Sequence, residues 1–218
     1  MDGLLLIDKP SGWTSFDVVA KIRNKLGVKK VGHSGTLDPM ATGLLILCVG
    51  KATKQIQEMI GFDKEYIAEI TLGATTNTDD AEGEIKKSDI SKLINLDDIE
   101  TVLEKFRGEI EQVPPQFSAK KIKGQRAYAM ARKGQEVKLE PVKITIHELE
   151  LLNYQWPVLS IRVLSSKGTY IRALARDIGR ELGCGAYLSA LERTKIGPYN
   201  LSQAQQIADV TPEAPRFL

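Results

Sequence analysis

The stretch GHSGTLDPMATG, residues 32–43, leads directly into the apolar run LLILCV, residues 44–49. Six consecutive apolar residues are typical of a strand that is buried on both faces. The loop before such a strand is anchored to a rigid element, and loops held in this way often carry functional side chains. Asp38 is the single carboxylate of this loop. Because an Asp-Pro pair is also a common turn, the spacing alone leaves both a turn residue and a functional acid open for Asp38.

The hydrophobic pattern of the remaining chain predicts short strands mixed with amphipathic helices. Strands are expected at 3–7, 44–49, 66–72, 142–146 and 158–164, and helices at 53–60, 97–106 and 169–182. A further helix is expected to start from a cap at Thr14 or Ser15 and to end at Gly27. The strands do not alternate strictly with the helices, which argues against a doubly wound parallel sheet. We therefore expect an α+β fold with a central mixed, mostly antiparallel sheet flanked by helices. The length of 218 residues fits one catalytic domain over residues 1–211, followed by a short tail at 212–218.

Charge is distributed unevenly along the chain, although the net charge is only +2. Residues 21–33 carry five lysines and arginines and no acid, and residues 115–143 carry eight bases against two acids. Residues 79–111 hold eleven acids against five bases. This separation fits a basic groove for a polyanion with an acidic outer face, and it fits ordinary solvated faces equally well.

The rare residues exclude several classes of protein. Cys48 lies inside the apolar run and Cys184 has no CxxC partner, while His33 and His147 are the only histidines. This set offers no zinc-binding spacing, so we expect no metal and a reducing compartment. The first apolar run has four residues and no basic flank, which does not match a signal peptide, and no segment approaches 18 apolar residues. The expectation is a cytoplasmic protein without a membrane span.

Five stretches, in this order, resemble the motifs of one enzyme family. They are GHSGTLDPMATG at 32–43, DKEY at 63–66, TNTDDAEG at 76–83, VPPQFSA at 113–119 and SKGTYIR at 166–172. Together they resemble the TruB family of pseudouridine synthases, over about residues 3–200. The resemblance implies a pseudouridine synthase fold with an RNA-binding cleft. It also implies isomerisation of uridine 55 in the TΨC arm of transfer RNA, a reaction that imports no group and needs no cofactor.

The resemblance assigns three catalytic residues. Asp38 would be the carboxylate that stabilises or traps the ribose carbon, because an ionised carboxylate can do either. Arg172 would keep Asp38 charged in a partly dry pocket, although composition alone favours an ordinary surface charge on a helix. Tyr66 would stack on the target base, although most strand tyrosines serve in core packing.

Further residues are implied as binding residues. His33 would fill the space that the flipped uridine leaves, Asp80 would accept a hydrogen bond from the RNA, and Lys9 would support the floor of the active site. Tyr170 and Lys167 of the last motif would contact substrate. Phosphate contacts are expected from Lys120, Lys121, Lys123, Arg126 and Arg132, which would position the RNA without reading its sequence. The expected partner is the TΨC stem-loop of tRNA, bound by a monomer.

One departure from the family concerns the C-terminus. Bacterial members usually continue into a small RNA-binding domain of the PUA type, and this sequence, which ends at Leu218, is expected to lack it. Two other functions stay open beside the isomerase. One is an RNA-binding or tRNA-folding protein, and the other is the catalytic subunit of a guide-RNA pseudouridylation particle, although proteins of the second kind normally need this C-terminal domain. The complete set of Asp38, Tyr66 and Arg172 argues against a protein that only binds.

Overall fold

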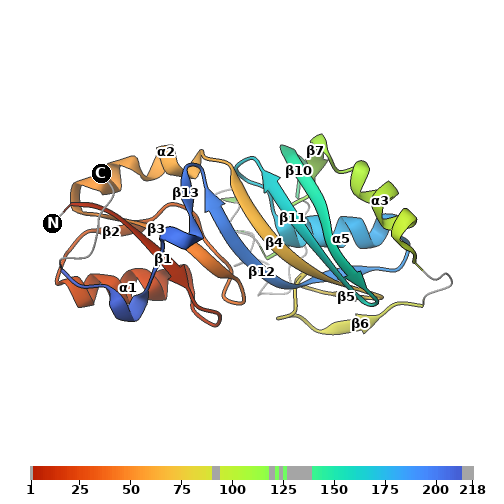
Figure 1. Cartoon of the computed structure of the whole chain (residues 1–218), viewed down its shortest axis with the longest axis horizontal. Helices are drawn as coiled ribbons and strands as arrows, with labels where there is room; N and C mark the ends of the chain where they lie inside the picture. The colour runs from red at the N-terminus through yellow and green to blue at the C-terminus, as the bar shows by residue number, and fades with distance from the viewer. Residues whose placement is uncertain (1, 90–93, 118–120, 123–124, 127–138, 213–218) are drawn as a thin grey trace. The chain divides into compact units, whose positions relative to one another are not determined.

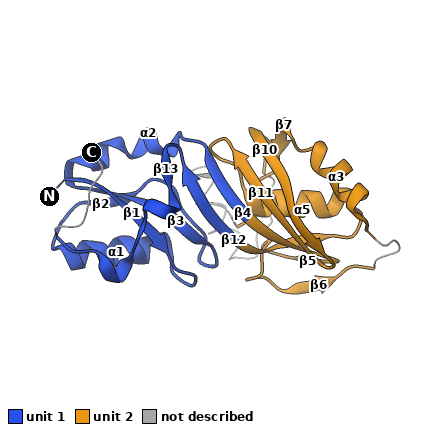
Figure 2. Ribbon diagram, viewed as in Figure 1, with its two compact units in different colours: residues 1–67, 191–218 blue, residues 68–190 orange. Residues whose placement is uncertain are grey.

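The computed structural model describes residues 2–89, 94–117, 121–122, 125–126 and 139–212. The chain divides into two compact units, which Figure 2 shows in different colours. Unit 1 comprises residues 1–67 and 191–218, and unit 2 comprises residues 68–190. Two strands that Figure 1 labels, β4 (Lys64–Leu72) and β12 (Ala186–Ile196), contribute residues to both units. Among the described residues, no helix has the length and apolar character needed to cross a bilayer.

Unit 1 is built on a sheet whose strands follow the order β14–β1–β3–β12. These are β14 (Gln205–Gln206), β1 (Gly3–Lys9), β3 (Thr42–Val49) and the end of β12, with β2 (Val31–His33) also paired to β3 and β13 (Tyr199–Asn200) to β12. β1 runs antiparallel to β3, whereas β12 runs parallel to β3 and β14 parallel to β1. The sheet is therefore mixed, as the sequence predicts.

The apolar runs of β1 and β3 are buried on both faces of this sheet. Helix α1 (Ser15–Leu26) covers one face, where its apolar side packs on alternate residues of the strands: Leu5, Ile7, Leu45, Leu47 and Val49. The intervening residues Leu4, Leu6, Leu44, Ile46 and Cys48 face the other side and pack with Met59 of α2 (Ile56–Ile60). This confirms the prediction that residues 44–49 form a buried core strand.

Local signals set the ends of α1. Thr14 caps its start, because the Thr14 side chain accepts a hydrogen bond from the Asp17 N–H while Asp17 bonds back to the Thr14 backbone. Gly27 ends the helix in the left-handed region, with φ 62°. The helix expected at 53–60 is shorter, because residues Gly50–Gln55 form the 3₁₀ turn η1 and only Ile56–Ile60 are α-helical.

Unit 2 contains the strand order β4–β11–β10–β7. Its strands are β7 (Gly108–Gln112), β10 (Val142–Gln155) and β11 (Val158–Ser165), and β10 is antiparallel to both β7 and β11. Its helices are α3 (Leu96–Glu104) and α5 (Ile171–Glu181), and its hairpins are β5 (Ala74–Thr76) with β6 (Ile85–Lys87) and β8 (Lys121–Ile122) with β9 (Gln125–Arg126). Helices and mixed strands confirm the α+β class.

The sequence pattern misses β12. Its residues Ala186, Leu188 and Leu191 are buried, but the strict alternation breaks between Leu188 and Leu191. The next inward position holds Arg193, where alternation predicts an apolar residue. Short 3₁₀ turns, η2 (Leu201–Gln203) and η3 (Ile207–Asp209), complete the described chain after β12.

Candidate active site

The segment that joins β2 to β3, residues 34–41, is called here the Asp38 loop. Its backbone turns at Asp38, where the Ala41 N–H donates to the Asp38 carbonyl at 3.1 Å. The turn that the Asp-Pro pair predicts is therefore present. Asp38 itself is half-buried between the buried residues Leu37 and Ala41. A carboxylate held in this way has a defined position and still reaches solvent.

Helix α1 holds the residue before Asp38. The buried Ser15 hydroxyl donates to the Leu37 carbonyl at 3.2 Å and accepts from the Leu37 N–H at 2.9 Å. Both polar groups of one loop residue are thus satisfied by one side chain in the first turn of α1. This pair fixes the loop to the helix at the position adjacent to Asp38.

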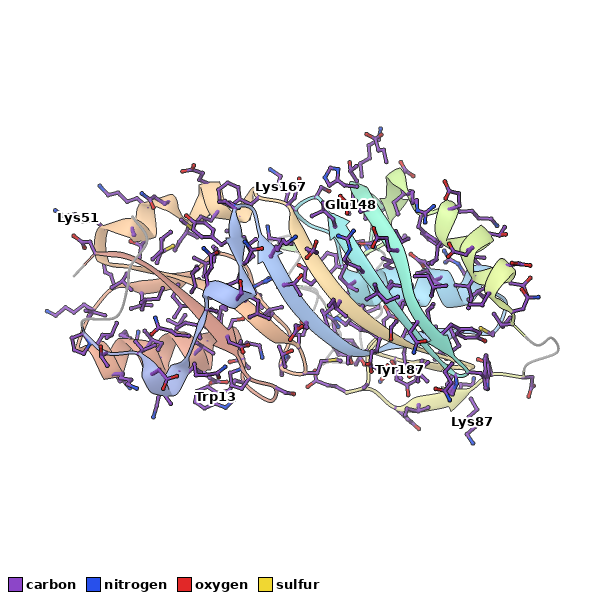
Figure 3. All side chains as sticks on the ribbon, viewed as in Figure 1. Trp13, Lys51, Lys87, Glu148, Lys167 and Tyr187 are labelled. Atoms are coloured by element: carbon purple, nitrogen blue, oxygen red, sulfur yellow. The ribbon has the colours of Figure 1, made fainter. Side chains whose placement is uncertain are left out.

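The residue after Asp38 is held by Lys9. This side chain is fully buried at the end of β1, and its ammonium donates to the Pro39 carbonyl at 3.2 Å. It also donates to the carbonyls of Pro10 at 2.9 Å and Trp13 at 2.6 Å, the latter residue being labelled in Figure 3. Lys9 therefore joins two loops, which fits the supporting role that the family resemblance implies.

Two residues of the turn between β1 and α1 complete the attachment. The Gly12 N–H donates to the Pro39 carbonyl at 2.8 Å, and the Ser11 hydroxyl donates to the Met40 carbonyl at 3.2 Å. Backbone groups on both sides of Asp38 are thus bonded to other parts of unit 1.

Arg193 of β12 supports the start of the Asp38 loop and the strand that follows the loop. Its guanidinium is buried, with 1% of the residue exposed, and donates from Nε to the Leu44 carbonyl at 2.8 Å and from Nη2 to the Gly35 carbonyl at 3.2 Å. The backbone of Arg193 also lies against Gly43, which has φ +95°. A Cβ atom at Gly43 would come within 2.5 Å of the Arg193 carbonyl oxygen, so only glycine fits there.

Tyr66 lies at the start of β4, in unit 1, and is 8% exposed. Burial lowers the pKa of Arg193, and the neighbouring Tyr66 opposes that effect. The adjacent residue Glu65 accepts from the Thr194 hydroxyl at 2.8 Å and from the Lys195 ammonium at 3.2 Å, so side chains join the two strands beside this pair.

His33 ends β2, immediately before the Asp38 loop. Its Nδ1 accepts a hydrogen bond from the Gly35 N–H at 3.3 Å. Its ring meets the Phe16 ring edge to face, with centroids 5.4 Å apart and planes at 88°. Phe16 is 64% exposed, so this pair presents aromatic surface next to the loop. Burial and the charge of Arg193 lower the pKa of His33, which favours the neutral imidazole.

In unit 2, Arg172 occupies the first turn of α5. Its Nη1 lies 3.3 Å from Asp80 Oδ2 and donates to the Thr78 carbonyl at 3.1 Å, while Nη2 donates to the Phe117 carbonyl at 3.0 Å. Both side chains are buried, 8% exposed for Arg172 and 3% for Asp80. The other Asp80 oxygen accepts from the Thr78 hydroxyl at 2.6 Å and the Glu82 N–H at 3.0 Å. Arg172 is therefore a buried, fixed cation and not the surface charge that composition favours.

A second ion pair follows one helical turn later. Arg176 Nη1 lies 2.9 Å from Asp79 Oδ2, and its Nη2 donates to the Val113 carbonyl at 2.8 Å. Asp79 has φ 63°, an uncommon conformation for a residue other than glycine. Burial raises the pKa of Asp79, while Arg176 opposes this effect. The two pairs attach the 76–83 segment to α5.

Two hydrogen bonds from one side chain hold the start of α5. The buried Gln112 side chain accepts from the Tyr170 N–H at 2.9 Å and donates to the Tyr170 carbonyl at 3.1 Å. Tyr170 is half-buried, and Lys167, labelled in Figure 3, is exposed on the loop before the helix. Both side chains stay predicted substrate contacts.

Two of the expected phosphate contacts, Lys121 and Arg126, lie in the β8–β9 hairpin. Lys121 pairs with Arg126 in the register of that hairpin, whereas Lys120, Lys123 and Arg132 lie outside the described residues.

The predicted site residues thus fall into two groups. Unit 1 holds Tyr66 on β4 and the Asp38 loop, to which Lys9 and His33 are bonded, and unit 2 joins Arg172 to Asp80. The expected ion pair between Asp38 and Arg172 joins residues of different units and stays a prediction. Direct contact of Asp80 with RNA also stays a prediction, although both of its oxygens are bonded inside unit 2.

The sequence does not predict three residues whose side chains bond the backbone of the site: Ser15, Gln112 and Arg193. Ser15 follows a helix cap and resembles any other residue of a first turn. Gln112 precedes a proline-rich stretch that gives no sign of its partner. Arg193 alone carries a signal, because a charged residue at an inward-facing position of a strand requires a polar partner.

Comparison with protein families gives two matches. Residues 23–171 match the model of the TruB family pseudouridylate synthase N-terminal domain, and residues 172–214 match that of the tRNA pseudouridylate synthase B C-terminal domain. The chain is 51% identical over 213 residues to tRNA pseudouridine synthase B of Parabacteroides distasonis, covering 95% of this chain and 91% of that protein. It is 50% identical to the protein of the same name from Francisella philomiragia, covering 94% of this chain and 68% of that protein.

Two solved structures are also similar to this chain. A Cbf5-Nop10-Gar1 complex contains a chain that superposes with a TM-score of 0.75 at 32% identity, over 95% of this chain and 53% of that one. An H/ACA RNP bound to a substrate RNA containing 2′-deoxyuridine gives a TM-score of 0.72 at 30% identity, over 95% and 51%. This chain therefore spans about half the length of those two solved chains. With a family model matching most of its length and relatives at about half identity, the chain belongs to the TruB family of pseudouridine synthases.

Proposed function

We propose that this chain isomerises uridine to pseudouridine in tRNA, at uridine 55 of the TΨC arm, with Asp38 as the catalytic carboxylate. The observation that carries the proposal is the fixed position of Asp38. Backbone groups of Leu37, Pro39 and Met40 are all bonded to the β1–α1 region, while Asp38 stays partly open to solvent. Relatives with about half of their residues identical carry the name tRNA pseudouridine synthase B.

The reaction needs few groups. The bond between ribose C1′ and uracil N1 breaks, the base turns, and C5 bonds to C1′; C5 loses its hydrogen and N1 gains one. An electron-poor sugar carbon forms on the way, and an ionised carboxylate can stabilise or trap it. A rigid loop supports this role, because a carboxylate held near the reacting carbon loses little freedom on reaching the transition state.

The other predicted residues take supporting roles in this proposal. Tyr66 contacts the target base, and Arg172, fixed by Asp80, supplies positive charge to the site. Uridine must leave its stack before Asp38 can reach the sugar, which costs a few kcal/mol. His33 and the exposed Phe16 ring offer aromatic surface to the unstacked RNA, and such stacking stabilises bound bases by about 1–3 kcal/mol each.

The remaining binding energy would come from phosphate contacts. Lysines and arginines of the 115–143 segment contact the backbone of the TΨC stem-loop in this proposal, so affinity falls as salt rises. We also propose that the enzyme acts in the cytoplasm, as a monomer and without a cofactor.

The test uses unmodified tRNA transcribed with uridine tritiated at C5. Because the isomerisation replaces the C5–H bond, each turnover releases one tritium, and carbodiimide mapping locates the changed uridine. We expect release from one uridine in the TΨC arm by the wild type and none by Asp38→Asn, with similar RNA affinity in both. Release by Asp38→Asn at the wild-type rate would reject the catalytic role of Asp38.

The same assay separates the alternative functions. A protein that only binds or folds tRNA would release no tritium, and a subunit of a guide-RNA particle would release it only after a guide RNA is added. The similarity to a chain of an H/ACA RNP makes the second control necessary.

A further inference from the structure

Phe16 is a large apolar side chain that the fold leaves in solvent. It lies in the first turn of α1 and is 64% exposed, next to the buried Ser15 that bonds the Asp38 loop. The apolar cluster beneath α1 does not include Phe16. Single apolar side chains are common on protein surfaces, so the contacts of this ring decide whether it has a role.

The Phe16 ring contacts the imidazole of His33, the last residue of β2. The two ring centroids lie 5.4 Å apart, and the ring planes are inclined at 88°. This is the edge-to-face geometry that aromatic rings prefer. Because the backbone of His33 is held by pairing with Leu47 of β3, the contact limits the rotation of the imidazole about its side-chain bonds.

A second contact holds the other side of the imidazole. The Gly35 N–H donates to His33 Nδ1 at 3.3 Å, and a ring nitrogen accepts only when it carries no hydrogen. The neutral imidazole therefore carries its hydrogen on Nε2. Within the part of the chain that the structure describes, no group bonds Nε2, and this nitrogen is not a buried atom. The Nε2–H edge of the ring is thus open to solvent.

The two contacts complement each other. At 3.3 Å the Gly35 bond is longer than usual, so by itself it leaves the ring some freedom. The Phe16 ring restrains the imidazole at a different point. A side chain that is already held in its bound orientation loses less entropy when it enters a partner.

We propose that Phe16 is a positioning residue, which together with the Gly35 N–H holds His33 in one orientation and one tautomer for its entry into the RNA. This inference rests on the proposed function, in which His33 meets the RNA that the flipped uridine has left, and deepens it. Phe16 acts through His33 here, so direct stacking of Phe16 on a base is the competing explanation.

A double-mutant cycle separates the two explanations. Phe16→Leu keeps an apolar side chain but removes the ring, and we expect kcat/KM for tritium release to fall about threefold to tenfold. In a His33→Ala background the same substitution should cost less than about twofold, because the ring that it positions is gone. An equal loss in both backgrounds would show that Phe16 acts on the RNA directly, and would overturn the proposal. So would an unchanged kcat/KM for Phe16→Leu alone.

A conservative variant serves as the matched control. Phe16→Tyr keeps the ring and should retain most of the rate that Phe16→Leu loses. Because Phe16 is largely exposed, we expect both variants to melt at the wild-type temperature. If Phe16→Tyr is as slow as Phe16→Leu, the ring contact is not the cause and the proposal fails.

A measurement without catalysis keeps this inference distinct from the proposed function. The chain has two histidines, so in a His147→Gln background His33 alone gives imidazole signals in isotope-labelled NMR spectra. Long-range proton–nitrogen correlations should show the Nε2–H tautomer. The ring-current shift of the His33 protons should disappear in Phe16→Leu and persist in Phe16→Tyr. A wild type that releases no tritium would reject the proposed function, whereas His33 shifts that are identical in Phe16→Leu would reject only the positioning by Phe16.

Discussion

Ser15 and Leu37 are bonded to each other twice, through the Leu37 N–H and the Leu37 carbonyl, and both bonds use the same serine hydroxyl. These two bonds therefore hold the start of helix α1 and the loop carrying Asp38 in a fixed position relative to each other. This arrangement makes the position of the carboxylate depend on a residue that bears no catalytic group.

Ser15→Ala removes both bonds and leaves two backbone groups of a buried residue without partners. We expect the free energy of unfolding in urea to fall by about 1–3 kcal/mol, and the rate of tritium release to fall with it at temperatures where the protein is folded. Thr14→Ala is the matched control, because it removes the helix cap at a cost of about 1 kcal/mol without touching the loop. If both variants lose activity equally, the loss follows from stability and not from the loop.

Lys9→Met removes the buried ammonium and leaves the carbonyls of Pro10, Trp13 and Pro39 without that donor. We expect catalysis to fall more than RNA affinity, because Lys9 holds the loop and is itself shielded from solvent. Single-turnover rates and filter binding measure the two quantities. Lys25→Met is the control. The Lys25 ammonium also donates to carbonyls in unit 1, those of Ile207 and Ala208, but Lys25 is exposed. Its substitution should change neither the rate nor the RNA affinity. A large loss of RNA affinity with an unchanged rate would assign Lys9 to direct binding.

In Arg172→Lys, a single ammonium group replaces the guanidinium group, which contacts three acceptors. Because the pair with Asp80 is buried, we expect the rate to fall at least about tenfold, equivalent to about 1.4 kcal/mol. Arg176→Lys alters the neighbouring pair with Asp79 on the same helix and serves as control. We expect it to lower the melting temperature while keeping most of the rate. Near-normal turnover by Arg172→Lys would contradict a role for its geometry.

The lowered pKa of His33 predicts a pH dependence of stability. In the unfolded chain His33 titrates near 6.5, whereas burial and Arg193 keep it neutral to lower pH in the folded protein. Between the two pKa values the unfolded form binds more protons, so this contribution to stability is complete above 6.5 and is lost as the pH falls below it. His33→Gln should therefore lose less stability than the wild type between about pH 7.5 and 5.5, measured by urea unfolding. If the free energy of unfolding fell equally with pH in the two proteins, the lowered pKa of His33 would be contradicted.

The fold could be predicted where a pattern repeats locally. The apolar runs of β1 and β3, the cap of α1 and the glycine at its end each act within a few residues, and each is present. Of the two caps that the sequence leaves open, Thr14 and Ser15, the structure uses Thr14. Strand β12 could not be predicted, because Arg193 breaks the apolar alternation and its partners, Gly35 and Leu44, lie about 150 positions earlier.

In the candidate site, too, local motifs could be predicted from the sequence and distant partners could not. A motif indicates Asp38, Tyr66 and Arg172 as candidates, but it does not indicate what holds them. Ser15, Gln112 and Arg193 act through bonds to backbone groups far along the chain, and no local signal records such a partner. Burial of Lys9 and Asp80 likewise follows from tertiary packing and not from residue type.

The contact between Gly43 and the Arg193 backbone has a consequence for biosynthesis. The Asp38 loop leaves the ribosome long before Arg193 of the strand behind it, because 149 positions separate Leu44 from Arg193. Until residue 193 emerges, Gly43 lacks the Arg193 backbone that it lies against, and the guanidinium that bonds Gly35 and Leu44 does not exist. During this interval the nascent chain carries the Asp38 loop without the arginine that bonds it, so the loop reaches its final support only after strand β12 is made.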